Sequence, residues 1–142
     1  MIVLDTTVLA YAVGSEHRFQ GPCMRLMEAI EAGSLSATTT PEVIQEFAHI
    51  RARRAARQNA IELATAFADL LAPLIAVEET ALRRGLALYG DHHGIGSFDA
   101  VLLAAAMDTG ATAIASADAA FGAVGGIRHV VPDDVGVSAL LG

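Results

Sequence analysis

The chain contains no lysine, a single cysteine and few aromatic residues. All nine basic residues are arginine, against sixteen acidic residues, and the formal net charge is −7. A protein this acidic does not coat nucleic acid by bulk positive charge. Because Cys23 is alone, no disulfide can form within the chain, which favours a reducing compartment.

Long uncharged stretches are also missing. The longest, residues 6–15 and 32–41, are about half as long as the roughly 20 apolar residues of a membrane helix. No basic-then-apolar leader precedes Asp5, so we expect a cytoplasmic protein with no membrane partner. Apolar residues make up 54% and charged residues 18% of the 142 positions. This composition excludes a disordered chain and predicts one domain, residues 1–142.

Short apolar runs alternate with helical patterns along the chain. The expected strands are residues 2–4, 35–38, 74–77, 112–116 and 128–131. The expected helices are residues 6–13, 22–32, 41 into the arginines at 51–57, 59–71, 79–89 and 97–108. Thr40 and Pro41 form a helix start, and Ser97 is the expected cap of the last of these helices. The alternation predicts an α/β fold, with a mostly parallel sheet of about four or five strands flanked by helices.

Three aspartates stand at places where sites form in such folds. Asp5 directly follows the first expected strand, and Asp118 comes two residues after a later one. The carboxyl ends of parallel strands form the ligand crevice of open sheets. Asp99 lies in the first turn of a helix, where an acid also complements the helix dipole without any other role.

Glu46 stands on an apolar helical face. Val43, Phe47 and Ile50 occupy one stripe of its helix, and Glu46 falls on the same stripe. A buried carboxylate is costly unless it is paired or bound to a metal. Two other readings stay open: an edge position whose carboxylate reaches solvent, or an ion pair with an arginine.

These four carboxylates would repel one another if the fold brought them together. A divalent cation removes that conflict, and ligands that are all oxygen select Mg²⁺ or Mn²⁺ over zinc.

Four motifs, taken in order, resemble those of PIN-domain ribonucleases, specifically the VapC-type toxins of type II toxin–antitoxin modules. The motifs are Ile-Val-Leu-Asp-Thr-Thr at residues 2–7, Pro-Glu-Val-Ile-Gln-Glu-Phe at 41–47, Ser-Phe-Asp-Ala at 97–100 and Ser-Ala-Asp-Ala-Ala-Phe at 116–121. The resemblance covers nearly the whole chain. It implies the PIN-domain fold and a Mg²⁺- or Mn²⁺-dependent endoribonuclease.

The resemblance also assigns roles by position. The metal-binding and catalytic set that it implies is Asp5, Glu46, Asp99 and Asp118. Thr7 and Ser116 match polar residues that order the site. Ala119 and Ala120 stand where some relatives carry a further acid, which weakens the case for a second metal.

The implied partners are a cognate antitoxin protein and an RNA substrate, whether tRNA, rRNA or mRNA. A homodimer and toxin–antitoxin hetero-oligomers are expected from the family as well. In the family, the region of residues 8–13 and 24–30 helps to form the antitoxin groove and the dimer contact. Simple core packing is the alternative for these apolar residues.

Four of the nine arginines stand within residues 51–57. If the helix continues unbroken, Arg53, Arg54 and Arg57 fall on the same side as Glu46, where they could contact RNA phosphates or acids of a partner. Arg51, Arg53 and Arg54 are the candidate RNA-contacting residues. The alternatives are a solvated helix end and ion pairs with acids such as Glu62.

Two other functions compete with the endoribonuclease. The first is a noncatalytic PIN-like module that binds protein or RNA, against which the complete set of four acids counts. The second is a phosphatase of the haloacid dehalogenase type. Such enzymes have a second aspartate two positions after the first, where this chain has Thr7.

Overall fold

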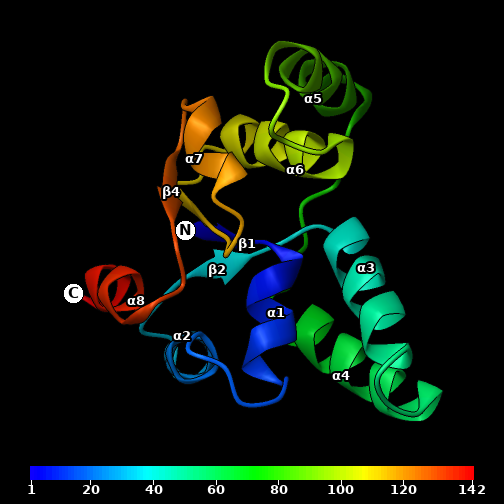
Figure 1. Cartoon of the computed structure of the whole chain (residues 1–142), viewed down its shortest axis with the longest axis vertical. Coiled ribbons are helices and arrows are strands. Elements are labelled where there is room, and N and C mark those ends of the chain that lie inside the picture. The colour runs from blue at the N-terminus through cyan, green and yellow to red at the C-terminus, as the bar shows by residue number, and fades with distance from the viewer.

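The computed structural model describes all residues from 1 to 142 and contains four strands and eight helices (Figure 1). The strands are β1 (Ile2–Leu4), β2 (Ala37–Thr38), β3 (Ala113–Ala115) and β4 (Arg128–Val130). The helices are α1 (Thr6–Ala12), α2 (Gln20–Glu31), α3 (Pro41–Ala52), α4 (Arg57–Leu70), α5 (Glu79–Asp91), α6 (Ser97–Asp108), α7 (Ala120–Val124) and α8 (Asp134–Leu141).

The sheet is parallel throughout and has the strand order β2-β1-β3-β4. Ile2 in β1 is in register with Ala37 of β2 on one side and with Ala113 of β3 on the other. The chain therefore winds from β1 to β2 in one direction and then crosses to β3 in the other. The ends of β1 and β3 consequently flank the switch point, where open parallel sheets bind ligands. The predicted α/β fold is confirmed.

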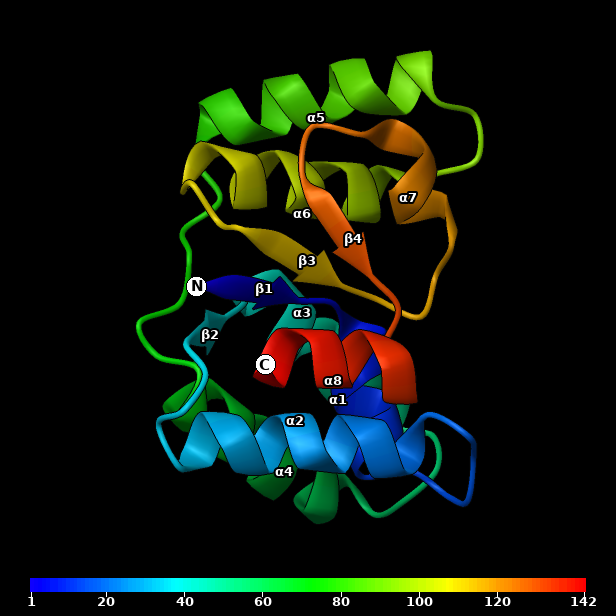
Figure 2. The same cartoon turned by 90° about the vertical axis from the view of Figure 1, so that its left-hand side faces the viewer.

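Helices lie on both sides of the strands. Figure 2 shows α5 and α6 above the strands and α2 with α8 below them. All three residues of β1 are buried, and α6 is buried along most of its length because alanines and leucines fill it. No helix has both the length and the apolar character that crossing a membrane requires.

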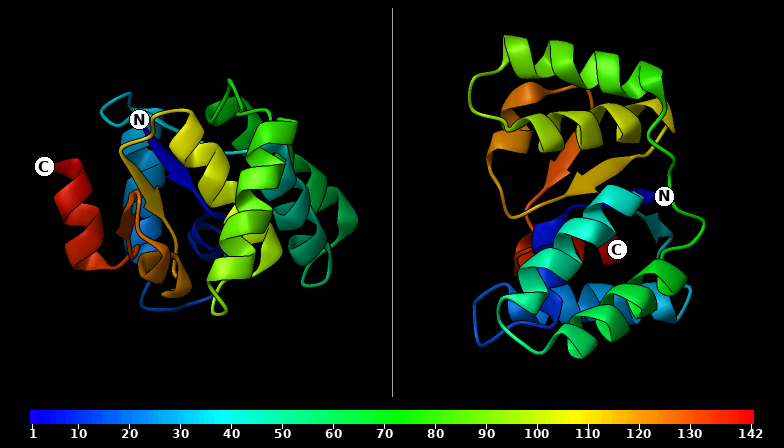
Figure 3. Two further views of the ribbon diagram at one scale, coloured as in Figure 1. Left: turned by 90° about the horizontal axis from the view of Figure 1, so that it is seen from above. Right: turned by 90° about the vertical axis from the view of Figure 1, so that its right-hand side faces the viewer.

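Two helical pairs support the site. α3 and α4 fold back on each other (Figure 3), and the rings of Phe47 and Phe67 meet edge to face with centroids 5.0 Å apart. α5 lies along α6 at Gly85, where an added Cβ would stand 2.5 Å from the Cα of Val101. Only glycine allows this approach of the two helices.

Several local predictions are corrected. Residues 74–77 form no strand, because the extended backbone there makes one bond to the sheet side, from Ile75 N to Thr39 O at 2.9 Å, rather than a ladder. Ser97 is the first residue of α6, whose N-cap is Gly96. α3 reaches the first of these arginines, Arg51, and ends at Ala52, so the condition of an unbroken helix through the whole cluster is not met. The short helices α7 and α8 were not predicted.

Other local predictions hold. The Thr40 side chain accepts a hydrogen bond from the backbone N–H of Val43 at 3.2 Å, and Pro41 is the first residue of α3. This cap fixes where α3 starts and therefore where Glu46 points.

Candidate metal and catalytic site

One cavity of about 450 Å³ is lined by all four predicted acids, Asp5, Glu46, Asp99 and Asp118. They come from four separate segments: the end of β1, the middle of α3, the first turn of α6 and the loop after β3. The structure therefore brings together residues that lie up to 113 positions apart in the sequence.

Asp5 is the most buried of the acids, with 3% of its surface exposed. Its Oδ2 accepts hydrogen bonds from Thr7 Oγ1 at 2.9 Å and from Ser116 Oγ at 2.7 Å. Both bonds fall on the same oxygen, which leaves Oδ1 available to the cavity. The carboxylate is thus held in one orientation with one oxygen facing the other acids.

The two hydroxyls also join the ends of β1 and β3. Thr7 Oγ1 accepts from the backbone N–H of Ala117 at 3.0 Å, and Ser116 Oγ accepts from the N–H of Asp118 at 3.0 Å. Each hydroxyl therefore donates to Asp5 and accepts from the loop that carries Asp118. The positions of Thr7 and Ser116 agree with the site-ordering role that the resemblance implies.

Glu46 is exposed, so of the readings left open, the edge position that reaches solvent is the one observed. Thr6 Oγ1 donates to its Oε2 at 2.8 Å. Thr6 is a residue that sequence reasoning missed. The only signal was a hydroxyl between Asp5 and Thr7, and its partner lies 40 positions away.

Asp99 is the site acid whose environment opposes its ionisation most clearly. Burial, followed by the charges of Asp5, Asp118 and Glu46, raises the pKa of the Asp99 carboxyl to about 7. No three acidic, histidine or cysteine side chains are grouped closely enough to hold a metal ion as they stand; the acids line an open cavity. Four carboxylates around one cavity have the chemistry that suits a hard divalent ion, which would also offset the acidic charges that contribute to this pKa.

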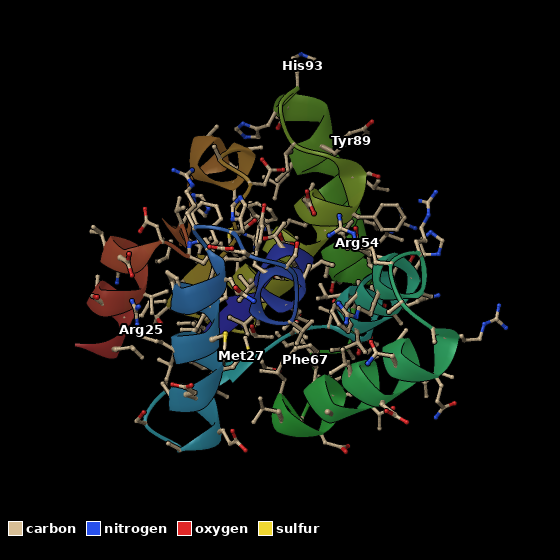
Figure 4. The ribbon with its side chains drawn as sticks, turned by 60° about the horizontal axis from the view of Figure 1, so that its bottom comes forward. Arg25, Met27, Arg54, Phe67, Tyr89 and His93 are labelled. Carbon is tan, nitrogen blue, oxygen red and sulfur yellow. The ribbon has the colours of Figure 1, made fainter.

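The arginine cluster divides by position. Arg54 lines the same cavity as the four acids and is marked in Figure 4. Arg51 instead donates from Nε to Asn59 Oδ1 at 2.8 Å and from Nη1 to the carbonyl of Val13 at 3.1 Å. Arg53 is exposed at the end of α3 and does not line the cavity. Of the three candidates for RNA contact, only Arg54 lines the cavity that the four acids line.

Comparisons with known proteins agree with this arrangement. A family model described as the PIN domain matches residues 2–127. Ribonuclease VapC7 of Mycobacterium tuberculosis (strain ATCC 25618 / H37Rv) is 47% identical over 146 aligned residues, which cover 100% of this chain and 99% of that protein.

Among solved structures, the "Structure of FitAB bound to IR36 DNA fragment" matches with a TM-score of 0.72, covering 93% of this chain and 95% of that chain. At 17% identity this likeness shows the fold alone. The match to the family model and the relative that aligns over its full length identify the family as well as the fold. The chain belongs to the PIN-domain family, as a ribonuclease of the VapC type.

Proposed function

We propose that the chain is the toxin of a type II toxin–antitoxin module, a Mg²⁺- or Mn²⁺-dependent endoribonuclease inhibited by a cognate antitoxin. The observation that carries the proposal is the convergence of four carboxylates on one cavity in a chain of this family. The relative named Ribonuclease VapC7 supports RNA as the substrate class.

The acids have distinct proposed roles. Asp5 and Asp99 would hold the metal ion chiefly, with Asp118 and Glu46 completing the set. When bound, the ion supplies Lewis-acid chemistry for hydrolysis of a phosphodiester by water. Thr7 and Ser116 would orient the Asp5 carboxylate through their hydrogen bonds, and Glu46, which accepts a hydrogen bond from Thr6, would accept a proton. With water as the nucleophile, the products carry a 5′-phosphate and a 3′-hydroxyl.

RNA contact is local in this proposal. Setting the four site acids aside changes the formal charge only from −7 to −3, so the protein stays acidic overall. The Arg54 guanidinium lines the same cavity and would supply a positive charge for a substrate phosphate. We therefore expect selective cutting at low affinity instead of broad coating of RNA.

The partner proposals rest on the family. We propose a cytoplasmic toxin that forms a homodimer and binds its antitoxin, with residues 1–142 as one PIN domain. The early helices contribute mostly core, since Leu9 and Leu26 are buried and Met24, 45% exposed, is the one exposed large apolar side chain among residues 8–13 and 24–30. We therefore assign no antitoxin surface to them.

The test is RNA cleavage by the purified chain with Mn²⁺ or Mg²⁺, with sequencing of the new 5′ ends. Asp5→Asn should lower the rate by more than the roughly 10- to 100-fold that outer-shell partners of a metal contribute. Asp69→Asn, which changes an exposed acid on α4, is the matched control and should cleave normally.

Absence of cleavage with either metal, together with growth toxicity that Asp5→Asn leaves unchanged, would reject the endoribonuclease. A chain that binds RNA or protein but never cuts would support the noncatalytic module instead.

A further inference from the structure

The cavity that holds the four acids has a second end, lined by aromatic rings. It extends along α1 to the loop between α1 and α2, where Tyr11 and His17 line it. Their rings are stacked, with centroids 4.4 Å apart and planes inclined by 24°. The buried Phe19 ring meets both edge-on, at 5.4 and 5.2 Å. His17 is exposed and forms the outer layer of this stack.

Hydrogen bonds hold these rings in place. His17 Nδ1 accepts from the backbone N–H of Phe19 at 3.1 Å, so the neutral imidazole carries its proton on Nε2. Gln20 Nε2 donates to the carbonyl of Gly14 at 2.8 Å, and Arg51 donates to that of Val13 at 3.1 Å. Arg51 and Gln20 are therefore positioning residues for the loop, and the ring pair is formed before any ligand arrives.

Charged side chains also line the cavity. The four acids suit a metal ion, and Arg54 suits a substrate phosphate. Glu16 lines the cavity beside His17, and its negative charge disfavours a phosphate there. A neutral, flat group fits the ring end best. In single-stranded RNA that group is an unpaired base, which stacks on aromatic side chains.

We propose that Tyr11 and His17 form a subsite for one unpaired nucleobase of the RNA, flanking the phosphate that is cut. The exposed face of His17 stacks on the base, and Tyr11 supports the imidazole from behind. This inference rests on the proposed function and adds where one base of the RNA substrate binds and which side chains contact it. It gives the cavity a base-binding end and a phosphate-cutting end.

The experiment compares two fluorescent ten-unit probes of equal charge. One is a single-stranded RNA of mixed sequence, and the other carries the same phosphates on base-free tetrahydrofuran units. Both are titrated by fluorescence anisotropy against the full chain with Asp5→Asn, in EDTA so that no metal ion supports cleavage. We expect the RNA to bind about tenfold more tightly than the base-free probe, the size of one base stack.

Two substitutions separate the ring from the loop bond. His17→Asn keeps an acceptor for the Phe19 N–H but removes the ring, and it should reduce the tenfold preference for bases to near one. His17→Phe keeps a ring but removes the acceptor, and it should retain most of the preference. His93→Ala is the matched control, because His93 projects from the tip of the α5–α6 loop (Figure 4).

A preference for bases that survives His17→Asn would overturn the subsite. So would an equal loss of affinity for both probes, which would mean that His17 only shapes the loop. A parent protein that binds both probes alike overturns it too. RNA cleavage by the unmodified chain is scored separately, so the subsite can fail while the endoribonuclease stands, and base preference without cleavage would reject only the enzyme.

Discussion

Two cavities share Asp5, Glu46 and Asp99 but have different walls. The larger one, toward α1, is bordered by hydroxyls, stacked rings and Arg54. The smaller one, of about 340 Å³, lies between α3, α5 and α6 and has an apolar wall that includes Leu82 and Phe98. The three shared carboxylates therefore lie between a larger cavity with polar and aromatic walls and a smaller cavity with an apolar wall, which the packing of helices forms. The smaller cavity also has three further acids, Glu42, Glu78 and Glu79, whereas Arg54 lines only the larger one. We therefore expect RNA to bind on the side of the larger cavity.

The first prediction concerns the support behind the polar cavity. Ser116→Ala removes a donor to Asp5 and the acceptor of the Asp118 N–H. Mn²⁺ affinity, measured by isothermal titration calorimetry, should fall about 10- to 100-fold. Ser138→Ala, an exposed serine on α8, is the control. Unchanged Mn²⁺ affinity in a folded Ser116→Ala protein would show that the hydroxyl does not order the site.

The second prediction concerns the contact that builds the apolar wall. Gly85→Ala would place a methyl group 2.5 Å from the Cα of Val101, so α5 must move away from α6. The free energy of unfolding in urea should fall by about 1–3 kcal/mol. Gly90→Ala, in the same helix with open space around it, should change it little. Equal stabilities would mean that α5 is not held closely on α6.

The third prediction is a pH dependence of the metal-free protein. In the folded state the pKa of Asp99 is raised to about 7, whereas an unfolded aspartate titrates near pH 4. Folding therefore favours the protonated form, and this stabilisation is complete below about pH 4 and lost as the pH rises to about 7.

The measurement is the Tm of wild type and of Asp99→Asn across that range in EDTA. The variant should become progressively more stable than wild type between about pH 4 and pH 7, and the gap should then stay constant. Saturating Mn²⁺ should stabilise wild type alone. A stability difference between the two proteins that does not change with pH would show that the pKa of Asp99 is not raised in the folded state.

The smallest effect is expected on the apolar wall itself. Leu82 is 43% exposed, so Leu82→Ser should change stability by less than about 0.5 kcal/mol. Its RNA affinity in the anisotropy assay should match that of the parent. A weaker affinity would show that RNA also enters the apolar cavity, and the contrast between the two walls would then be wrong.

Features with a local cause were predictable from the sequence. Asp5 at the end of a buried apolar run and the start of α3 at Thr40 both follow from a few adjacent residues, and the structure has them where they were expected. Residues 74–77 have the apolar composition of a strand but form none. β2 is only two residues long, and residues 74–77 do not pair with it in the sheet. α7 is too short to show a helical period.

Features that depend on distant residues were not predictable. The apolar stripe of α3 left open whether Glu46 is buried or reaches solvent from its edge, and the structure has it exposed, with a hydrogen bond from Thr6 that the sequence did not predict. The arginines after Ile50 would share one side of the helix only if α3 continued through them. The chain turns at residues 53–56 instead, so Arg51 contacts Val13 whereas Arg54 lines the cavity. Tertiary contacts decided both outcomes.

The pairing of β1 with β3 has a consequence for the order of events during synthesis. β1 can pair with β3 only after Ala113, the partner of Ile2, has been synthesised. The hydrogen bond from Ser116 to Asp5 likewise needs 111 further residues after Asp5. Such long-range pairing makes assembly a late step. A growing chain on the ribosome therefore cannot bring the four acids together until Asp118 has been added and can pack beside Asp5.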